Sequence, residues 1–225
     1  NDMVDEATNV NTLQSFLAGG AQVGNDVEVN TANESYVLWN WMMEATGSGA
    51  SNTDGSINTT STLVDTTLGM SVSTYVGTGA NATIGHGLGV APELVMIKCL
   101  NYGGSSQWVV YHSALGGTKA LFLDSSVVAA TAIGYFNNTN PTSSVVSLGT
   151  SSYLNYSTKN HVAYCFAPSQ FMSFGSYVGN ANADGPFIPF LNSLGVPIQP
   201  RWTLIKAGDF ARSWYLSDVK RNGNG

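Results

Sequence analysis

The sequence predicts an all-β fold built from antiparallel β-sandwich modules of the jelly-roll or lectin-like type, in tandem and with little helix. First, the outline of Tyr75 to Lys98 (YVGTGANATIGHGLGVAPELVMIK) returns as Tyr177 to Gly179 followed by Pro200 to Lys206, which indicates an internal repeat. Second, charged residues make up only 10% of the chain, against roughly 25% in ordinary soluble domains. The polar surface must therefore come from Asn, Ser, Thr and Gly, which suit strands and turns. Third, no long segment keeps a 3.6-residue period.

The repeat has a second half that aligns without a gap. Residues 24–41 match residues 149–166 at a constant offset of 125. In the first half the Tyr-Val-Gly triplets lie 102 residues apart, the Pro…Ile-Lys segments 108 apart, and Trp108 and Trp214 106 apart. The pairs matched in the second half are Gly24 and Gly149, Asn30 and Asn155, Val37 and Val162, Trp39 and Tyr164, and Trp41 and Phe166.

These offsets predict three parts. Residues 1–68 would be the C-terminal half of one module plus a long Gly/Ser/Thr loop, residues 69–170 a complete central module, and residues 171–225 the N-terminal half of a further module. The outer halves should complete one another or pair with neighbouring chain, because proteins avoid open strand edges. The chain opens Asn1-Asp2-Met3, so we expect a segment of a longer protein or a processed start.

Apolar runs between turn signals place the elements. Ser35 to Met43 reads as a strand buried on both faces, and Thr12 to Ala18 as a short helix or an irregular strand. Val127 to Ile133 is a strand or a packed loop, and Gly47 to Asp65 an exposed, extended loop. In the central module strands are expected at Met70–Val76, Leu94–Leu100, Gln107–His112, Lys119–Leu123, Val145–Leu148 and Asn160–Phe166.

Charge and hydropathy exclude two classes of partner. The net charge is −6 and no basic run occurs, so we expect no nucleic-acid binding. The longest apolar run is far short of the ~18 to 20 residues that cross a bilayer, so we expect no membrane insertion. Cys99 and Cys165 are either two buried free thiols or a disulfide between neighbouring strands. No cysteine or histidine spacing is typical of a metal site, and we expect no metal and no cofactor.

The sequence contains no recognisable catalytic motif. The glycines around Gly77 do not open a helix, which a phosphate-binding loop needs. No nucleophile elbow occurs. Asp124 and Asp184 are the faint candidates for a glycan-active enzyme, but glycoside hydrolysis needs a paired acid and base. We therefore predict that the protein is not an enzyme.

A small set of side chains is a candidate for surface recognition. His86 lies in a Gly-His-Gly turn, where it is either a ligand contact at a loop tip or part of the turn structure. Tyr102, Tyr135 and Tyr153 fall on predicted loops, where exposed aromatic rings could stack on sugars. The five tryptophans fall at equivalent strand positions in the modules, which favours a place in the core.

Several of these motifs together resemble a known family. The sequence is similar to a repeated β domain found in tail-fibre and other virion structural proteins of tailed bacteriophages, especially those of marine bacteria. The resemblance covers about residues 20–225 and implies a virion component with no catalytic residues to carry over. Its motifs are SNTDGSI (51–57), YVGTG (75–79), GHGLGVAPELVMIK (85–98), WVVYH (108–112), KALFL (119–123), HVAYCF (161–166), FGSYVGNANADGPF (174–187) and the terminal PRWTLIK…SWYLSDVKRN.

The expected function follows from the repeat, the composition and this resemblance. We expect a structural virion protein, part of a tail fibre or similar surface appendage, that can adhere to host-surface glycans through its loops. Its partners would be other virion proteins and further copies of itself, a trimer by analogy with fibre proteins. It would be assembled in the host cytoplasm and extracellular once released. The alternatives are a capsid decoration or cement protein without sugar binding, and a glycan-active enzyme.

Overall fold

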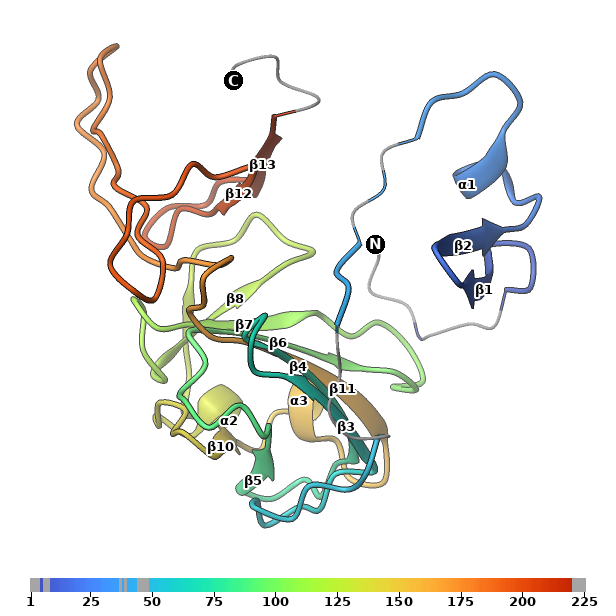
Figure 1. Ribbon diagram of the computed structural model, residues 1–225. Helices are drawn as coiled ribbons and strands as arrows, with labels where there is room; N and C mark the ends of the chain where they lie inside the picture. Colours follow the sequence, from blue (N-terminus) through green and yellow to red (C-terminus); the bar gives the residue numbers. More distant parts are fainter. Residues whose placement is uncertain (1–4, 6–8, 37, 39, 44–48, 220–225) are drawn as a thin grey trace. The chain divides into compact units, whose positions relative to one another are not determined.

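The structure, a computed structural model, describes residues 5, 9–36, 38, 40–43 and 49–219. The chain divides into two compact units (Figure 1). The small unit comprises residues 6–42, and the large unit comprises residues 1–5 and 43–225. Each unit is described by itself below.

A seven-stranded antiparallel sheet forms the large unit, and it confirms the prediction of a mainly β fold. Every neighbouring pair of strands in this sheet is antiparallel. In spatial order the strands are β3 (Ser61–Asp65), β4 (Met70–Val76), β11 (Asn160–Phe166), β6 (Leu94–Cys99), β7 (Val109–His112), β8 (Lys119–Phe122) and β9 (Ala130–Thr131).

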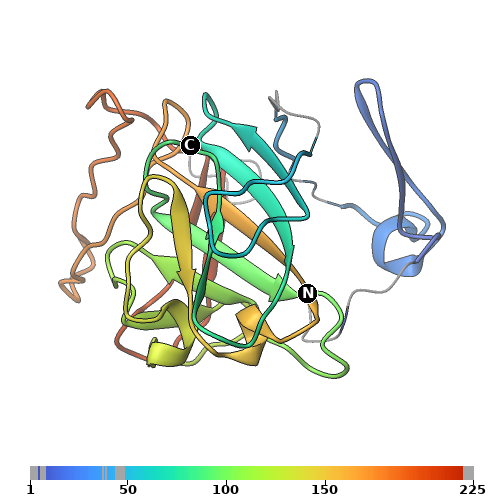
Figure 2. The same cartoon turned by 90° about the horizontal axis from the view of Figure 1, so that it is seen from below.

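A second layer covers one face of this sheet. It consists of the antiparallel pair β5 (Ala82–Gly85) and β10 (Val145–Leu148) with two single-turn helices, α2 (Ile133–Phe136) and α3 (Ser152–Asn155) (Figures 1 and 2). Helix α3 contacts β6, and α2 contacts β8 and β10. The main hydrophobic core lies between the two layers.

Alternation along the central strands builds that core. On β7, Val109 and Tyr111 belong to the main core, whereas Val110 points to a second cluster on the opposite face. Cys165 on β11 lies opposite Val95 of β6, and Cys99 lies opposite His161. Both thiols are therefore buried on neighbouring strands, but four positions apart in register, and both are free. At about 3.3 Å per residue this is too far for a disulfide, so the free-thiol alternative holds.

Asn155, at the end of α3, ties the covering layer together. This side chain is fully buried. Its Nδ2 donates to Ala80 O at 2.6 Å and to Gly149 O at 3.0 Å, and its Oδ1 accepts from Thr78 N at 2.8 Å. The backbone of Asn155 also accepts from Gly79 N at 2.8 Å. One amide thus joins the turn after β4 to the turn before α3.

The small unit contains the hairpin of β1 (Leu13–Leu17) and β2 (Gly20–Val23), followed by the single-turn helix α1 (Val27–Asn30). Its internal hydrogen bonds reproduce those around α3. Three pairs of backbone bonds match: Thr12 N to Asn9 O (3.3 Å) and Tyr135 N to Ala132 O (3.4 Å); Gly24 N to Thr12 O (2.6 Å) and Gly149 N to Tyr135 O (2.5 Å); Asp26 N to Asn11 O (2.9 Å) and Ser151 N to Gly134 O (2.7 Å). One pair of side-chain bonds also matches: Asn30 Nδ2 donates to Gly24 O (2.8 Å), and Asn155 Nδ2 donates to Gly149 O (3.0 Å).

Both of these hydrogen-bonded segments require a glycine at the same matched position, Gly24 in one and Gly149 in the other. A Cβ on Gly24 would collide with Asn11 O, and a Cβ on Gly149 would collide with Gly134 O. Both positions therefore require glycine for the same reason, a close approach of two backbone segments. This is the physical basis of the matched pair seen in the sequence.

The C-terminal part of the large unit contains a second strand pair whose register can be compared with that of the central sheet. Strands β12 (Trp202–Ile205) and β13 (Tyr215–Asp218) form a two-stranded antiparallel sheet. At offsets of 108 and 106 its register is that of β6 and β7: Leu204 lies opposite Leu216, as Met96 lies opposite Val110. The hairpin segment is bound to the β8 side of the large sheet, because Trp214 Nε1 donates to Phe122 O at 2.7 Å.

The structure corrects two predictions on the N-terminal side. The expected strand over Ser35–Met43 is absent from the described residues of that range, since residues 35, 36, 38 and 40–43 lie in no strand, while Val37 and Trp39 lie outside the described residues. A strand needs neighbours, and in the central module the equivalent β11 has β4 and β6 on its two sides. The stretch Gly47–Asp65 is not wholly an exposed loop either: it contains β3, which pairs with β4, and the buried Thr59.

Tyr177, the counterpart of Tyr75, also lies outside any strand. Tyr75 is on β4, with 1% of its surface exposed, whereas Tyr177 is 48% exposed. Among the described residues, no strand like β3 or β11 lies beside Tyr177. The expected helix or strand at Thr12–Ala18 is the strand β1, and Val127–Ile133 contains the short strand β9.

Candidate functional site

Three tyrosine rings meet at one end of the large unit and form what we call the tyrosine cluster: Tyr102, Tyr153 and Tyr156. Tyr102 lies in the connection from β6 to β7, and the other two lie on or just after α3. The ring centroid of Tyr102 is 5.8 Å from that of Tyr153 and 5.3 Å from that of Tyr156, both pairs tilted. The Tyr102 hydroxyl lies 3.0 Å from Ser152 Oγ.

Local structure fixes these rings. Ser151 caps α3, because its Oγ accepts from Tyr153 N at 3.4 Å, and buried Asn155 holds the end of the turn. The helix has only one turn, so Tyr153 and Tyr156 emerge on the same side, three residues apart. Gly103 N, next to Tyr102, donates to Asp5 Oδ2 at 2.7 Å, which fixes the connecting loop.

Tyr135 extends this row of aromatic rings toward the core. It lies on α2, and its ring packs edge-on against Phe122 at 5.6 Å. Burial, together with the nearby Tyr153 hydroxyl, raises the pKa of Tyr135. Three of the four residues predicted for surface recognition are thus brought close to one another, with Tyr135 packed against the core and Tyr102 and Tyr153 half-buried.

Polar groups border the cluster. Lys159 Nζ lies 5.9 Å from the centre of the Tyr156 ring, within the range of a cation–π contact. Asn101 Oδ1 accepts from Asn160 N at 2.7 Å, so its side-chain amide is held beside Tyr102 with the NH₂ group as a remaining donor. Tilted aromatic faces next to amide and ammonium donors form a surface that can pack against the apolar face of a sugar ring and bind its hydroxyl groups.

His86, the fourth predicted recognition residue, is placed elsewhere. It is fully buried, so it presents no surface to a ligand in this structure. Its Nε2 lies 3.2 Å from Thr142 O, and its Nδ1 accepts from Leu88 N at 3.2 Å. Burial lowers the pKa of His86, which keeps the ring neutral. This geometry favours the turn-structure alternative for the Gly-His-Gly motif.

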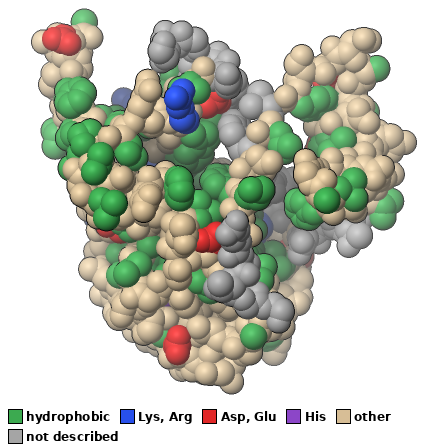
Figure 3. All heavy atoms as spheres, viewed as in Figure 1, with side chains coloured by type: hydrophobic (Ala, Val, Ile, Leu, Met, Phe, Trp, Pro, Cys, Tyr) green, Lys and Arg blue, Asp and Glu red, His purple; other side chains and the backbone are tan. Residues whose placement is uncertain are grey.

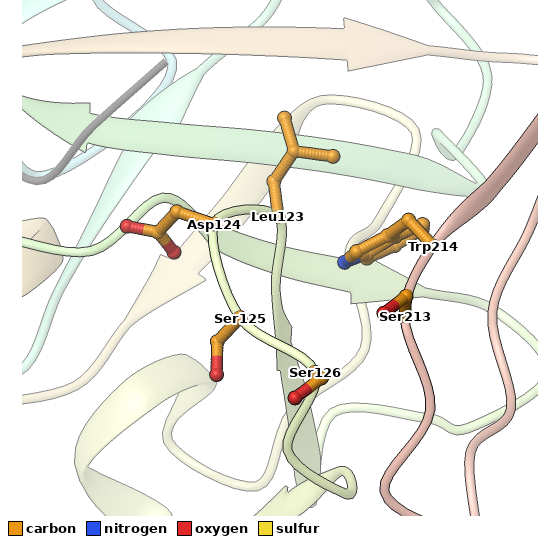
Figure 4. Close-up of a pocket in the computed structure, with 6 residues that line it drawn as sticks. All are labelled: Leu123, Asp124, Ser125, Ser126, Ser213 and Trp214. Carbon is orange, nitrogen blue, oxygen red and sulfur yellow. The ribbon is translucent and has the colours of Figure 1, made fainter.

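A shallow hollow of about 300 Å³ lies where the C-terminal segment meets the end of β8 (Figure 4). Both carboxylate oxygens of Asp124 are buried, and neither has a hydrogen-bond partner in the described part of the chain. In Figure 4, Asp124 and Trp214 lie on opposite sides of the hollow, and the Asp124 carboxylate is turned away from the Trp214 ring. The lining residues are Leu123, Asp124, Ser125, Ser126, Ser213 and Trp214.

The hollow lacks the second carboxylate that glycoside hydrolysis requires, since Asp124 is the only acidic residue among its six lining residues. The other faint candidate, Asp184, lies in an exposed turn in which Asn180 Nδ2 donates to Asp184 O at 3.2 Å. Over the described residues, no group of three or more His, Cys, Asp or Glu side chains is arranged to hold a metal ion. Nor does the described part of the chain contain a helix long and apolar enough to cross a membrane.

Sequence reasoning missed Tyr156. The residue stands three positions after Tyr153, next to the Asn155 that the repeat had already marked. An aromatic pair at this spacing on one helical turn was the available signal. Its proximity to Tyr102, 54 residues away in the sequence, depends on the pairing of β6 with β11.

Residues 1–225 match the family described as Domain of unknown function (DUF7483). No curated protein and no solved structure matches the chain.

Proposed function

The chain belongs to the DUF7483 family, and from this premise and the geometry above we propose that it is a structural component of a bacteriophage virion, part of a tail fibre or a similar surface appendage. The single observation that carries the proposal is the reappearance of one β substructure along the chain. Asn30 and Asn155 make the same bond to a matched glycine, at 2.8 and 3.0 Å.

The repeat supports tandem β-sandwich modules. The small unit has the hydrogen bonds of the segment that leads into α3, and the β12–β13 hairpin has the register of β6 and β7. The whole module between them has a large sheet covered by the smaller β5–β10 sheet. Elongated surface proteins are built from such units, because each copy contacts mainly its neighbours.

The surface supports an assembly protein. Charged side chains are few on the face shown in Figure 3, where hydrophobic and uncharged polar groups dominate the described residues. Exposed apolar patches larger than a few hundred Å² are rare on monomeric proteins and mark contacts with other proteins. We propose other virion proteins and further copies of this chain as those partners, with three copies by analogy with fibre proteins.

The tyrosine cluster is the proposed site of host-surface glycan adhesion. A glycan array probed with the purified protein tests it. Tyr102→Ala should lower binding at least about fivefold, because one ring of a stacking site contributes roughly 1 kcal/mol or more. Tyr215→Ala is the matched control: this tyrosine is 61% exposed on β13, outside the cluster, and its loss should leave binding unchanged.

The outcomes separate the proposed classes. Binding that is lost in both variants would reflect a general surface effect and would contradict the site. No binding to any glycan would favour a capsid decoration protein, which uses the same modules to bridge subunits. Antibodies against the chain, imaged on phage particles by electron microscopy, locate it: label on the capsid shell, and not on a tail fibre or appendage, would overturn the fibre proposal.

A further inference from the structure

We infer that the tyrosine cluster takes an acidic sugar, a glycan residue that carries a carboxylate or a sulfate, and that the Lys159 ammonium contacts the charged group. The inference rests on the glycan adhesion proposed above and names the chemical class of the glycan. It is independent of the proposed virion role.

Lys159 is a cation without a counter-charge at the edge of the cluster. Its Nζ lies 5.9 Å from the centre of the Tyr156 ring. Among the described residues the one ion pair joins Lys119 to Asp209, so no described carboxylate is paired with Lys159. The chain as a whole carries a net charge of −6, which makes an unpaired cation beside exposed aromatic rings a local exception. A ring face attracts an ammonium through its quadrupole but does not neutralise its charge, so the ammonium still attracts an anion.

The backbone fixes where this cation starts. Lys159 N donates to Tyr156 O at 3.1 Å, and Lys159 O accepts from Gly77 N at 2.9 Å and from His161 Nδ1 at 3.0 Å. The three bonds involve only the main chain of Lys159. The stem of the side chain is therefore anchored beside the rings before a ligand arrives, which lowers the ordering cost of binding.

The surroundings of Tyr102 add a donor and no free acceptor of opposite charge. Asn101 Oδ1 accepts from Asn160 N at 2.7 Å, which leaves the Asn101 NH₂ group to donate. The acidic residue tied to this loop is Asp5. Its Oδ2 accepts from Gly103 N at 2.7 Å, and its Oδ1 is buried. Two donors, one of them charged, thus border the rings, and they match a ligand group that only accepts hydrogen bonds.

Charge selects among sugars where the rings do not. Tyr156 is 39% exposed, and an aromatic face of this kind packs against the apolar face of a neutral or an acidic sugar alike. The ammonium distinguishes the two, because hydrogen bonds between ionised groups are roughly twice as strong as those between neutral ones. A sugar bearing an amine would instead be repelled. We expect an acidic glycan to bind at least about fivefold more tightly than its neutral form.

Glycan pairs that differ only in charge test the inference with the full-length chain. One pair is an oligogalacturonate and its carboxyl-reduced form, and the other is a sulfated galactose oligomer and its desulfated form. Any further acidic glycan that binds on the array is compared with its neutral form in the same way. Affinities are measured by biolayer interferometry. The pair that shows the preference identifies the acidic group as a carboxylate or a sulfate.

Salt gives a readout that needs no variant. Screening weakens an exposed charge pair, whereas the packing of rings on a sugar is nearly insensitive to it. The ratio of the acidic to the neutral affinity should be about five or more in about 0.05 M salt and should approach one in about 0.5 M salt.

Three variants locate the preference. Lys159→Gln keeps a polar side chain but removes the charge, so the affinity ratio should fall to about one. Lys159→Arg keeps the charge and should keep the ratio above one. Lys119→Gln is the matched control: it makes the same change of charge on β8, outside the cluster, and should leave the wild-type ratio unchanged. Circular dichroism of each variant checks that folding is intact.

The results separate this inference from glycan adhesion itself. Equal affinity for acidic and neutral forms, or tighter binding of the neutral forms, would overturn the inference and leave adhesion standing. A ratio that survives in Lys159→Gln would overturn it as well. So would an equal loss in Lys119→Gln, since the preference would then follow the net charge of the chain. No binding to these glycans or to any other on the array would contradict both the inference and the adhesion on which it rests.

Discussion

Two buried polar side chains hold the junction between the large sheet and the layer that covers it. His161, fully buried on β11, stacks on Tyr75 with ring centroids 5.1 Å apart. Its Nε2 accepts from Tyr156 N at 3.3 Å, and its Nδ1 donates to Lys159 O at 3.0 Å, which is the pattern of a neutral ring. Burial lowers the pKa of His161 to about 4. The same ring thus supports the core and orients the backbone that carries the tyrosine cluster.

Stability should therefore fall as the pH drops from about 6.5 to about 4. In this window the unfolded chain binds a proton at His161, whereas the folded chain does not, so acid favours unfolding. The contribution of this residue is about 2 kcal/mol between pH 7 and pH 5. Urea unfolding at the two pH values measures it. His161→Gln should show a smaller loss than the wild type, and an equal loss in both proteins would contradict the assignment.

Asn155→Ala should destabilise the large unit strongly. The substitution leaves the buried Gly149 O and the partly buried Ala80 O and Thr78 N without their side-chain partner, and a buried unsatisfied group costs about 1 to 3 kcal/mol. We expect a loss of about 3 kcal/mol or more in the free energy of unfolding. Asn30→Ala is the internal control: its side chain is exposed, and the same change there should cost under about 1 kcal/mol. Similar losses at both positions would argue against the special role of burial.

At the scale of elements, the C-terminal segment is held by a few contacts. Trp214 Nε1 donates to Phe122 O at 2.7 Å, Ala129 N donates to Gly208 O at 3.0 Å, and Lys206 Nζ donates to Val127 O at 2.9 Å. Trp214 also packs on the second hydrophobic cluster beneath β7 and β8. This segment covers the face of the sheet that the β5–β10 layer leaves open.

Trp214→Phe should loosen this segment while leaving the large sheet folded. An aromatic ring is retained, although it is smaller than the indole, and one partly buried hydrogen bond of about 1 kcal/mol is lost. Brief digestion with trypsin, followed by mass spectrometry, should show cleavage after Lys206 and Arg212 several times faster than in the wild type. Tyr215→Phe, at an exposed position on β13, serves as the control. Unchanged cleavage in Trp214→Phe would mean that other contacts hold the segment.

The sequence predicted the elements whose pairing partners are close by. The strands of the central module carry period-two patterns and sit beside turn signals, and they formed where expected. Ser35–Met43 is an apolar run of strand length, yet its described residues form no strand, because a strand depends on neighbours that a local pattern does not supply. The strand β3 was missed, since STLVD was hidden at the end of a Gly/Ser/Thr stretch.

The candidate site was predicted only in part, for the same reason. Tyr102 and Tyr153 could be recognised as loop tyrosines, but their proximity depends on how β6 and β11 pair. The burial of His86 depends on Thr142, 56 residues away, and a Gly-His-Gly motif alone does not reveal it. A single sequence does not predict which residues far apart along the chain come into contact.

At the scale of the whole molecule, the two thiols report on global unfolding. Cys99 and Cys165 lie in the centre of the large sheet, and burial raises the pKa of Cys165 to about 12. Burial also raises the pKa of Cys99. A thiol that is both covered and protonated reacts slowly with disulfide reagents. We expect almost no reaction with Ellman's reagent in the native protein at pH 8, and two thiols per chain in urea.

The rate of labelling should then follow the rate at which the sheet opens. Conditions that slow unfolding should slow labelling in proportion, as measured by stopped-flow unfolding in parallel. Rapid reaction of one thiol in the native state would instead indicate local opening of β6 or β11.

The four-position stagger between these cysteines has one more consequence. Since no crosslink can form between them in the folded sheet, the fold neither requires an oxidant to mature nor loses a covalent brace when glutathione is present. The same chain can fold under reducing conditions and keep an identical core under oxidising ones.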